Sequence, residues 1–311
     1  MGTNSEMKNR IDNLPLIRKI EMLSKTASAG EQYRLYSYFG RSYLLKIIPG
    51  KQEKVLLENR LWLSEGLPVQ RIHRTGTTKD GETYTLSQWI PGNTLDEVFP
   101  CGSYAEEREL GIRCGNLLKK IHSSLPKYTD LHMIQRLEER LDNAEKRISS
   151  EINTDGAETL LNAVHRLQRE VSSLEDGPCF RLHGDYHTGN LVLDRSERLH
   201  ILDPVYGSAG APEEDHARVL VSAEHSKIFA RGQIESYYTG NIPEWFWGRL
   251  RFYILLHLVE AWSFGEGKGS SAIFKDLLRI TEKQYPQLLS GNDIIIKKET
   301  PLFWRNADGN R

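Results

Sequence analysis

The chain has 311 residues, of which 39% are hydrophobic and 27% are charged, and its formal net charge is −1. This composition is ordinary for a globular protein with a sizeable core. The balanced charge gives no support to a nucleic acid or an anionic membrane surface as a partner. Its three cysteines, Cys101, Cys114 and Cys179, are widely spaced. A reducing compartment therefore fits better than a disulfide framework.

The sequence shows no targeting or membrane segment. Its first ten residues, MGTNSEMKNR, are polar and lack the apolar core of a signal peptide. The longest apolar run near the C-terminus, Phe252 to Val259, is too short to span a bilayer. We therefore expect a cytoplasmic protein that has no membrane partner.

The first ninety residues predict strands around one helix. Residues 32–38 (QYRLYSY) and 42–48 (SYLLKII) are β-rich runs separated by a short turn, which predicts a hairpin. Residues 52–64 predict a helix that ends before a Gly-Leu-Pro stop. Residues 71–76 and 83–90 flank a Lys-Asp-Gly turn and predict a second hairpin.

The pattern changes at Ile90-Pro91-Gly92, where we expect a lobe boundary, with one domain over 1–90 and a second over 91–311. Beyond it, Ser103 and Glu106 form a capping-box motif that predicts a helix start. Three apolar stripes at helical spacing predict core helices: Leu110, Cys114, Leu117, Ile121; Leu137, Leu141, Ala144, Ile148; and Leu160, Val164, Leu167, Val171, Leu174. Pro212 and Pro243 predict two more helix starts, and residues 293–304 predict a strand or an extended strap.

The chemistry is concentrated in residues 180–204, FRLHGDYHTGNLVLDRSERLHILDP. NLVLD and LHILD are β-type runs, and a hairpin closed tightly between them would oppose residue 194 to 199 and Asn190 to Asp203, with Cβ atoms about 5 Å apart. Ser196-Glu197 is not a preferred two-residue turn, so a looser loop would change this register. Amide and carboxylate oxygens suit magnesium, which takes its remaining ligands from phosphates and water.

Asp185 lies five residues before Asn190, on the loop that leads into the same hairpin. A carboxylate there could accept the proton of an attacking hydroxyl or hold that hydroxyl in line. Gly184 and Gly189 allow the loop to turn sharply.

Two histidines flank this aspartate. His183 and His187 are four residues apart, but the intervening glycine disfavours a helix and no further ligand follows at a metal-binding spacing. We expect His183 to pack under the loop and donate hydrogen bonds to its backbone. We expect His187 to orient Asp185 or to contact phosphate.

The order His-x-Asp-x-x-x-x-Asn followed by a later Asp resembles the catalytic loop and metal-binding Asp of protein kinases. HGDYHTGN followed by ILDP resembles more closely the aminoglycoside phosphotransferase superfamily, which includes choline, homoserine, methylthioribose and fructosamine kinases. The phrases LWLSEGLPV, WIPG and LLKKIH extend the resemblance over most of the chain. It implies an α+β, protein-kinase-like two-lobed fold, with a small β-rich N-lobe and a larger, mainly helical C-lobe.

The resemblance also implies roles for individual residues. Asp185 would be the catalytic base, Asn190 and Asp203 would hold Mg²⁺, and Lys46 would contact the ATP phosphates. The nucleotide would further be bound by Ser28 and Gly30 in a turn over the phosphates, by the backbone of Gln88, Trp89 and Ile90 at the adenine, and by His187. The strand LLKII supports the role of Lys46, because a buried ammonium needs a partner such as phosphate.

Several features depart from the protein kinases. No Gly-x-Gly-x-x-Gly or Asp-Phe-Gly is present, which argues against a protein kinase. The glutamate that should pair with Lys46 is Glu53 or Glu58, or no glutamate serves, and the sequence does not decide among these. The resemblance implies that Asp215, in the run Pro-Glu-Glu-Asp, braces the catalytic loop from the first turn of a helix. We expect Glu213 and Glu214 to be solvated.

These features together predict an ATP- and Mg²⁺-dependent phosphotransferase with an alcohol group as acceptor. An aminoglycoside or related antibiotic is the first acceptor class, which would make the protein an antibiotic resistance enzyme. DPVYG is closer to streptomycin, methylthioribose and fructosamine kinases, so a metabolic kinase of the choline, homoserine, methylthioribose or sugar-derivative type is the alternative. A non-catalytic nucleotide-binding regulator is a further one. The sequence does not decide whether the phosphate donor is ATP or GTP, or whether the protein is a monomer or a homodimer.

Overall fold

The computed structural model describes residues 7, 10–12, 14–26, 30–48, 54–101, 103–154, 156–174, 177–264, 272–289, 295 and 299–305. The chain divides into two compact units. The first unit is Met1–Asn93 together with Val192–Gly207, and the second is Thr94–Leu191 together with Ser208–Arg311. The short segment 192–207 thus belongs with the N-terminal residues, although the sequence places it between helices.

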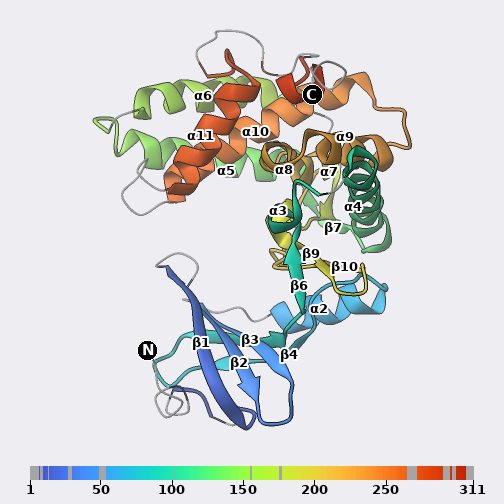
Figure 1. The fold of residues 1–311 in the computed structure, drawn as a ribbon. Coiled ribbons are helices and arrows are strands. Elements are labelled where there is room, and N and C mark those ends of the chain that lie inside the picture. Colours follow the sequence, from blue (N-terminus) through green and yellow to red (C-terminus); the bar gives the residue numbers. More distant parts are fainter. Residues whose placement is uncertain are drawn as a thin grey trace. The chain divides into compact units, whose positions relative to one another are not determined.

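The first unit is built on a five-stranded antiparallel sheet (Figure 1). Its strands are β1 (Ile17–Thr26), β2 (Gly30–Ser37), β3 (Ser42–Ile48), β4 (Ile72–Thr77) and β5 (Thr83–Gln88), in the spatial order β1-β2-β3-β5-β4. The pairings β2–β3 and β4–β5 confirm both predicted hairpins. The sequence did not reveal β1, because two irregularities in its register interrupt the alternation of side chains.

The two faces of this sheet have different characters. Tyr33, Leu35, Leu45 and Leu86 point to one face and form an apolar core with Ile11. Since successive side chains of a strand point to opposite faces, Gln32, Lys46 and Thr85 occupy the other face, where they are aligned across β2, β3 and β5.

Helix α2 (Val55–Ser64) and a small second sheet complete the first unit. The sheet has the order β10-β9-β6, from β6 (Gly92–Thr94), β9 (Leu191–Asp194) and β10 (Leu199–Ile201). Asp194 donates its N–H to the Arg198 oxygen (3.0 Å), and Glu197 has a left-handed φ of 57°. The loop therefore contains three residues, of the kind with a left-handed third position. The expected opposition of 194 and 199 is wrong by one residue.

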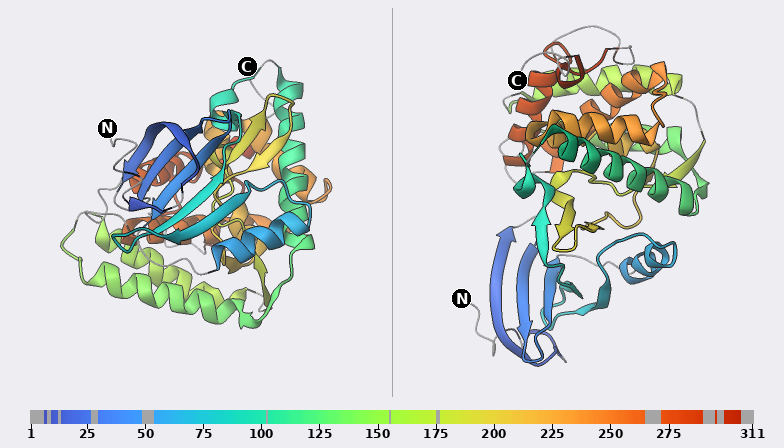
Figure 2. Two further views of the ribbon diagram at one scale, coloured as in Figure 1. Left: turned by 90° about the horizontal axis from the view of Figure 1, so that it is seen from below. Right: turned by 45° about the vertical axis from the view of Figure 1, so that its right-hand side comes forward.

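The second unit is mainly helical (Figures 1 and 2). Its helices are α3 (Leu95–Val98), α4 (Tyr104–Ser124), α5 (Met133–Ser149), α6 (Ala157–Glu170), α7 (Pro212–His216), α8 (Val219–His225), α9 (Lys227–Tyr237), α10 (Glu244–Phe264), α11 (Ala272–Gln284) and α12 (Leu302–Arg305). A small sheet with the order β11-β8-β7 comprises β7 (Tyr128–His132), β8 (Pro178–Arg181) and β11 (Ala209–Gly210), and the 3-10 turns are η1 (Val171–Ser173) and η2 (Thr188–Asn190).

Most sequence expectations for the second unit are confirmed. Ser103 accepts the N–H of Glu106 while the Glu106 side chain accepts the N–H of Ser103, so the capping box starts α4. The buried stripe of α4 contains Leu118, which is fully buried, in place of the expected Leu117. The tail differs: residues 302–305 form a short helix rather than a strand or strap.

Helix α10 carries buried apolar side chains on most of its surface, from Phe246 to Trp262, and contributes more buried residues to the core than any other described helix. Helices α5 and α6 lie side by side and contribute their predicted stripes to the same core (Figure 2). Across the described ranges, the structure contains no helix with the length and apolarity that a membrane crossing requires.

Helices α4 and α9 approach each other closely at two glycines. A Cβ atom at Gly111 would overlap the carbonyl oxygen of Phe229, and one at Gly115 would overlap that of Gln233. Both neighbours are backbone atoms, which cannot move away by a rotamer change. The contact therefore requires the absence of a side chain at these positions.

We predict that Gly111→Ala lowers the free energy of unfolding by about 1–3 kcal/mol, because the added methyl forces the two helices apart. This loss exceeds the gain of up to about 1 kcal/mol that alanine brings to a helix interior. Urea denaturation followed by circular dichroism measures the difference. Glu109→Ala, at an exposed position of the same helix, is the control, and equal midpoints for the two variants would contradict the close contact.

Candidate active site

The first unit contains a cavity of about 700 Å³ on the polar face of its large sheet. The sheet supplies one wall, the beginning of α2 a second, and the segment after β10 a third. Its lining residues are Gln32, Lys46, Ile48, Lys54, Val55, Gln70, Ile72, Thr85, Ser87, Asp203, Pro204, Val205, Tyr206 and Gly207. Every one of these residues belongs to the first unit.

Lys46 and Asp203 form an ion pair in this cavity. The Lys46 side chain is only 13% exposed, whereas that of Asp203 is 41% exposed. Asp203 has a left-handed φ of 48°, which is uncommon for a residue other than glycine. Among the described residues the acidic partner of Lys46 is Asp203 and not Glu58, and Glu53 lies outside the described residues.

The other residues expected to bind nucleotide have different positions. The Trp89 N–H donates to the Ser42 oxygen (3.2 Å), and the Arg34 guanidinium lies 4.1 Å from the centre of the Trp89 ring. Ile90 is buried. Gly30 starts β2 with a φ of 72° and leaves no space for a side chain, while Ser28 lies outside the described residues. Binding of adenine by the backbone of residues 88–90 stays a prediction.

Three residues that form or support the cavity wall were not identified from the sequence: Asn59, Gln70 and Tyr206. Asn59 is fully buried on α2 and joins two parts of the cavity wall, because its Nδ2 donates to the Gln70 oxygen (2.8 Å) and to the Tyr206 hydroxyl (2.7 Å). Its Oδ1 accepts the N–H of Ile72 (2.9 Å). The tyrosine of DPVYG, Tyr206, was the only one of these residues within a motif noted in the sequence. Nothing in the sequence shows that Asn59 contacts it.

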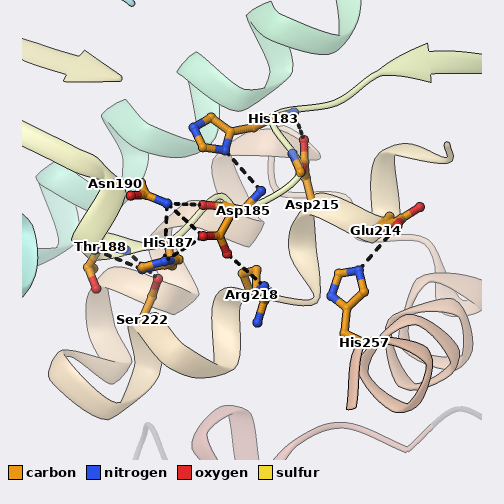
Figure 3. Close-up of polar contacts among 12 residues, drawn as sticks. His183, Asp185, His187, Thr188, Asn190, Glu214, Asp215, Arg218, Ser222 and His257 are labelled. Carbon is orange, nitrogen blue, oxygen red and sulfur yellow. Dashed lines mark hydrogen bonds and ion pairs between the residues drawn. The ribbon is translucent and has the colours of Figure 1, made fainter. Parts of the chain in front are cut away.

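The second unit presents Asp185 on the loop between β8 and η2, and Figure 3 shows the polar side chains that converge on it. Asn190 Nδ2 donates to the Asp185 carbonyl oxygen (2.9 Å) and to its Oδ2 (3.0 Å). Arg218 Nε lies 3.0 Å from Oδ1. The structure thus brings together the predicted Asp185, His187 and Asn190, and adds Arg218 from the turn before α8.

Electrostatics keep Asp185 ionised. Burial alone would raise the pKa of this carboxyl, but the hydrogen bond from His187 and the charge of Arg218 outweigh it and hold the pKa well below its usual range. The residue is therefore a carboxylate at neutral pH.

His187 is fixed in a defined orientation. Its Nδ1 accepts the N–H of Gly189 (3.1 Å), so a proton on the neutral ring resides on Nε2. Nε2 faces Asp185 Oδ2 at 3.4 Å. The geometry agrees with the expected role of orienting Asp185, and it leaves contact with phosphate as a prediction.

A buried carboxylate braces the loop from beneath, which confirms the expectation for Asp215. Its oxygens accept the N–H groups of His183 and Gly184, both at 2.7 Å, and His122 Nε2 lies 3.0 Å away. His183 is buried under the loop as expected, but its Nδ1 accepts the Asp185 N–H (3.2 Å) where a donor was expected.

The Asn190 side chain has one oxygen atom that the described contacts leave free, and its role as a metal ligand stays a prediction. Because both of its contacts to Asp185 use acceptor oxygens, the atom at that position must be Nδ2. This leaves Oδ1 without a partner among the described residues. An outward amide oxygen suits Mg²⁺, which usually keeps several of its ligands from water and phosphate.

Glu213 and Glu214 were expected to be solvated, and this is wrong: both are buried. Arg140 from α5 lies 2.7 Å from Glu214 and makes two hydrogen bonds, of 2.7 and 2.9 Å, to Glu260 on α10. His257 Nε2 lies 3.4 Å from Glu214 (Figure 3). The helix register places these acids toward neighbouring helices, which the charged run in the sequence does not reveal.

We predict that Glu214 makes stability depend on pH. Burial raises its pKa, but Arg140 and His257 overcome this and lower it from 4.5 to about 2. At about 1.4 kcal/mol for each pKa unit, the difference is worth about 3 kcal/mol. Because the folded pKa lies below the unfolded one, this stabilisation is complete above about pH 4.5 and is lost as the pH falls toward 2.

Glu214→Gln should therefore lower the free energy of unfolding by about 2–3 kcal/mol at pH 7 and flatten its decline between pH 5 and 2. Urea midpoints measured across this range test the expectation. Glu138→Gln, at an exposed position of α5, should follow the wild-type curve. A Glu214→Gln curve parallel to the wild type would show that the carboxylate does not titrate as argued.

The sequence of the chain matches a family model. Residues 28–253 match the model of the phosphotransferase enzyme family (APH). The comparison with curated proteins found no match.

Solved structures share the fold. The aminoglycoside phosphotransferase APH(4)-Ia, as a thermostable mutant in ternary complex with ADP and hygromycin B, has 14% identity and a TM-score of 0.65, over 89% of this chain and 95% of that one. Spectinomycin phosphotransferase APH(9)-Ia, in complex with ADP and spectinomycin, has 14% identity and a TM-score of 0.56, over 90% and 92%. Choline kinase LicA from Streptococcus pneumoniae has 16% identity and a TM-score of 0.62, over 89% and 97%.

At these identities the structures establish the fold, and the family model establishes the family. The α+β, protein-kinase-like fold with a small β-rich part and a larger helical part is as the sequence predicts. The chain belongs to the phosphotransferase enzyme family of which the aminoglycoside phosphotransferases are members.

Proposed function

We propose that this chain transfers the γ-phosphoryl group of ATP to a hydroxyl of a small molecule. The observation that carries the proposal is the state of Asp185, which three different side chains hold as an oriented carboxylate on the loop of a phosphotransferase-family chain. Phosphoryl transfer requires mainly positioning and charge stabilisation. An oriented carboxylate next to a candidate metal ligand supplies both.

The nucleotide would occupy the cavity of the first unit. Lys46 offers a nearly buried ammonium on the polar face of the sheet, which suits a phosphate oxygen. Gln88 ends β5, and residues 88–90 at this far end of the face would carry the adenine. Residues 1–90 would then act as the nucleotide-binding lobe, together with the 192–207 segment that supplies Asp203. The rest of residues 91–311 would form the acceptor-binding lobe.

Asn190 and Asp203 would hold magnesium through an amide oxygen and a carboxylate. When bound, the ion would neutralise charge on the phosphates. Asp203 at present pairs with Lys46, so nucleotide phosphates would compete for the lysine and free the carboxylate. This exchange would lose little electrostatic stabilisation, because Lys46 would pair with a phosphate and Asp203 with the magnesium ion.

Asp185 would receive the hydrogen bond of the acceptor hydroxyl and direct its oxygen at the γ-phosphorus. Asn190 fixes the carboxylate through Oδ2 and Arg218 approaches it through Oδ1. Neither contact depends on the acceptor, so the carboxylate is oriented before substrate arrives. We propose no covalent enzyme intermediate.

The first acceptor class to test is an aminoglycoside or related antibiotic, following the family and the solved structures with hygromycin B and spectinomycin. A second candidate, a metabolic kinase for a less cationic alcohol such as a sugar derivative, is favoured by one observation. The carboxylates of α7 and α10 near the loop are already paired, Glu214 and Glu260 with Arg140, and Glu213 with Arg249. A polycationic acceptor would have to displace these arginines.

We predict that Asp185→Asn lowers acceptor-dependent ATP turnover by about 10²–10⁴-fold, because the amide cannot take the hydroxyl proton. A coupled assay with Mg²⁺ and a panel of aminoglycosides, other antibiotics, choline, homoserine and sugars provides the measurement. Nucleotide affinity should change little. Asp276→Asn, at an exposed position of α11, should keep the wild-type rate.

The outcomes separate the candidates. Turnover with an aminoglycoside supports the antibiotic kinase, and turnover with choline or a sugar supports the metabolic one. Nucleotide binding without turnover of any acceptor would favour the regulator. A chain that binds no nucleotide would contradict all three.

We predict that Lys46→Met raises the Kd for ATP by about tenfold or more, since a charge-assisted contact to phosphate is lost. Adenosine, which lacks phosphates, should bind both proteins equally. Lys79→Met serves as the matched control, because Lys79 is exposed in the turn between β4 and β5. Equal losses for ATP and adenosine would place Lys46 away from the phosphates.

A further inference from the structure

One glutamine in the cavity of the first unit is held with unusual completeness. Gln70 is 8% exposed and lines the cavity. Its N–H donates to the Ile201 oxygen (2.9 Å), and its carbonyl accepts from Asn59 Nδ2 (2.8 Å). Its side-chain Nε2 donates to the Gln88 carbonyl (2.7 Å). Backbone and side chain are therefore both fixed before any ligand arrives.

These contacts determine which amide atom faces the cavity. The Gln88 carbonyl can only accept, so the Gln70 atom that meets it must be the NH₂ group. The other atom, Oε1, has no hydrogen-bond partner in the described part of the chain and is not sealed within the interior. Gln70 thus offers a fixed acceptor to a molecule in the cavity.

The strand register places this acceptor far from the phosphate end. Lys46 is aligned with Thr85, while Gln88 lies three residues further along β5, opposite Tyr43. At about 3.3 Å for each residue, the two positions are about 10 Å apart along the strand. A nucleotide whose phosphates contact Lys46 would extend its base toward Gln88 and Gln70.

We infer that Gln70 selects adenine nucleotides by accepting a hydrogen bond from the exocyclic 6-amino group. This inference rests on the proposed nucleotide-binding function. Adenine presents a donor at position 6, whereas guanine and hypoxanthine present an oxygen there. A 6-oxo base would bring its oxygen against Oε1, and these two acceptors would have no proton between them. The chain is therefore an ATP-dependent rather than a GTP-dependent enzyme.

The selectivity requires Gln70 to be rigid. Asn59 fixes its backbone carbonyl, and the Gln88 carbonyl fixes its side-chain amide. A single buried side chain bonds both Gln70 and Tyr206, which lie on different segments of the cavity wall. A glutamine free to rotate could turn its NH₂ group toward a 6-oxo base and accept either nucleotide. Here rotation would break the bond to Gln88 and leave that carbonyl unpaired.

The test compares Mg²⁺ complexes of ATP, ITP and purine riboside triphosphate by calorimetry on the full chain. ITP replaces the 6-amino group by an oxygen, and purine riboside triphosphate removes it. Wild-type protein should bind ATP about tenfold or more tightly than ITP. Gln70→Met, which keeps the size and removes the amide, should reduce this ratio by about three- to tenfold.

Gln32→Met is the matched control. Gln32 lines the same cavity but is aligned with Lys46 at the phosphate end, so its loss should weaken all three nucleotides by the same factor. Thermal unfolding of each variant ensures that folded proteins are compared.

Each remaining outcome has a definite meaning. Equal binding of ATP and ITP by wild-type protein would overturn the role of Gln70 and leave the proposed phosphotransferase function intact. An ATP preference that is unchanged or larger in Gln70→Met would also overturn the role of Gln70 in selectivity. Gln70 would then serve only as the hydrogen-bond donor to the Gln88 carbonyl in the free protein. Failure of the wild-type protein to bind any of the three would overturn the proposed function as well.

Discussion

The loop that carries the candidate catalytic residues depends on one buried carboxylate. Asp215 is 2% exposed and accepts hydrogen bonds from the backbone of His183 and Gly184, with His122 beside it. Burial would raise its pKa, but the contacts from His122 and the loop lower it. An unpaired charge at this depth would cost several kcal/mol, so any movement of residues 183–184 away from Asp215 is opposed. The position of Asp185 follows, because it is the next residue in the chain.

The first unit uses a different constraint, the two-residue period of a strand. Apolar side chains of β2, β3 and β5 fill one face, so the intervening residues must form the other. Lys46 thereby reaches a polar cavity although its neighbours Leu45 and Ile47 are core residues. The same alternation aligns it with Gln32 and Thr85. A one-residue slip would bury the lysine and expose the leucine, so the register is specified by the core itself.

Local sequence was sufficient where the signal was local. The two hairpins predicted the pairings β2–β3 and β4–β5, the capping box at Ser103 predicted a helix start, and the run HGDYHTGN identified Asp185 and Asn190. It was insufficient where a contact joins distant segments. Asn59 bonds Tyr206 across 147 positions, and Glu214 meets Arg140 from another helix. The prediction of the hairpin register failed for a second reason, because the loop, with its left-handed Glu197, is one residue longer than expected.

The charges around Asp185 bear on how such a carboxylate acts. A group whose pKa is held well below its usual range by Arg218 and His187 is a weak base. It would not remove a proton from an alcohol before bond formation begins. In a loose transition state, however, the attacking oxygen becomes acidic only late, as its bond to phosphorus forms. A weak, rigid carboxylate therefore serves such a reaction chiefly by orienting the hydroxyl, and it receives the proton once the oxygen has lost its affinity for it.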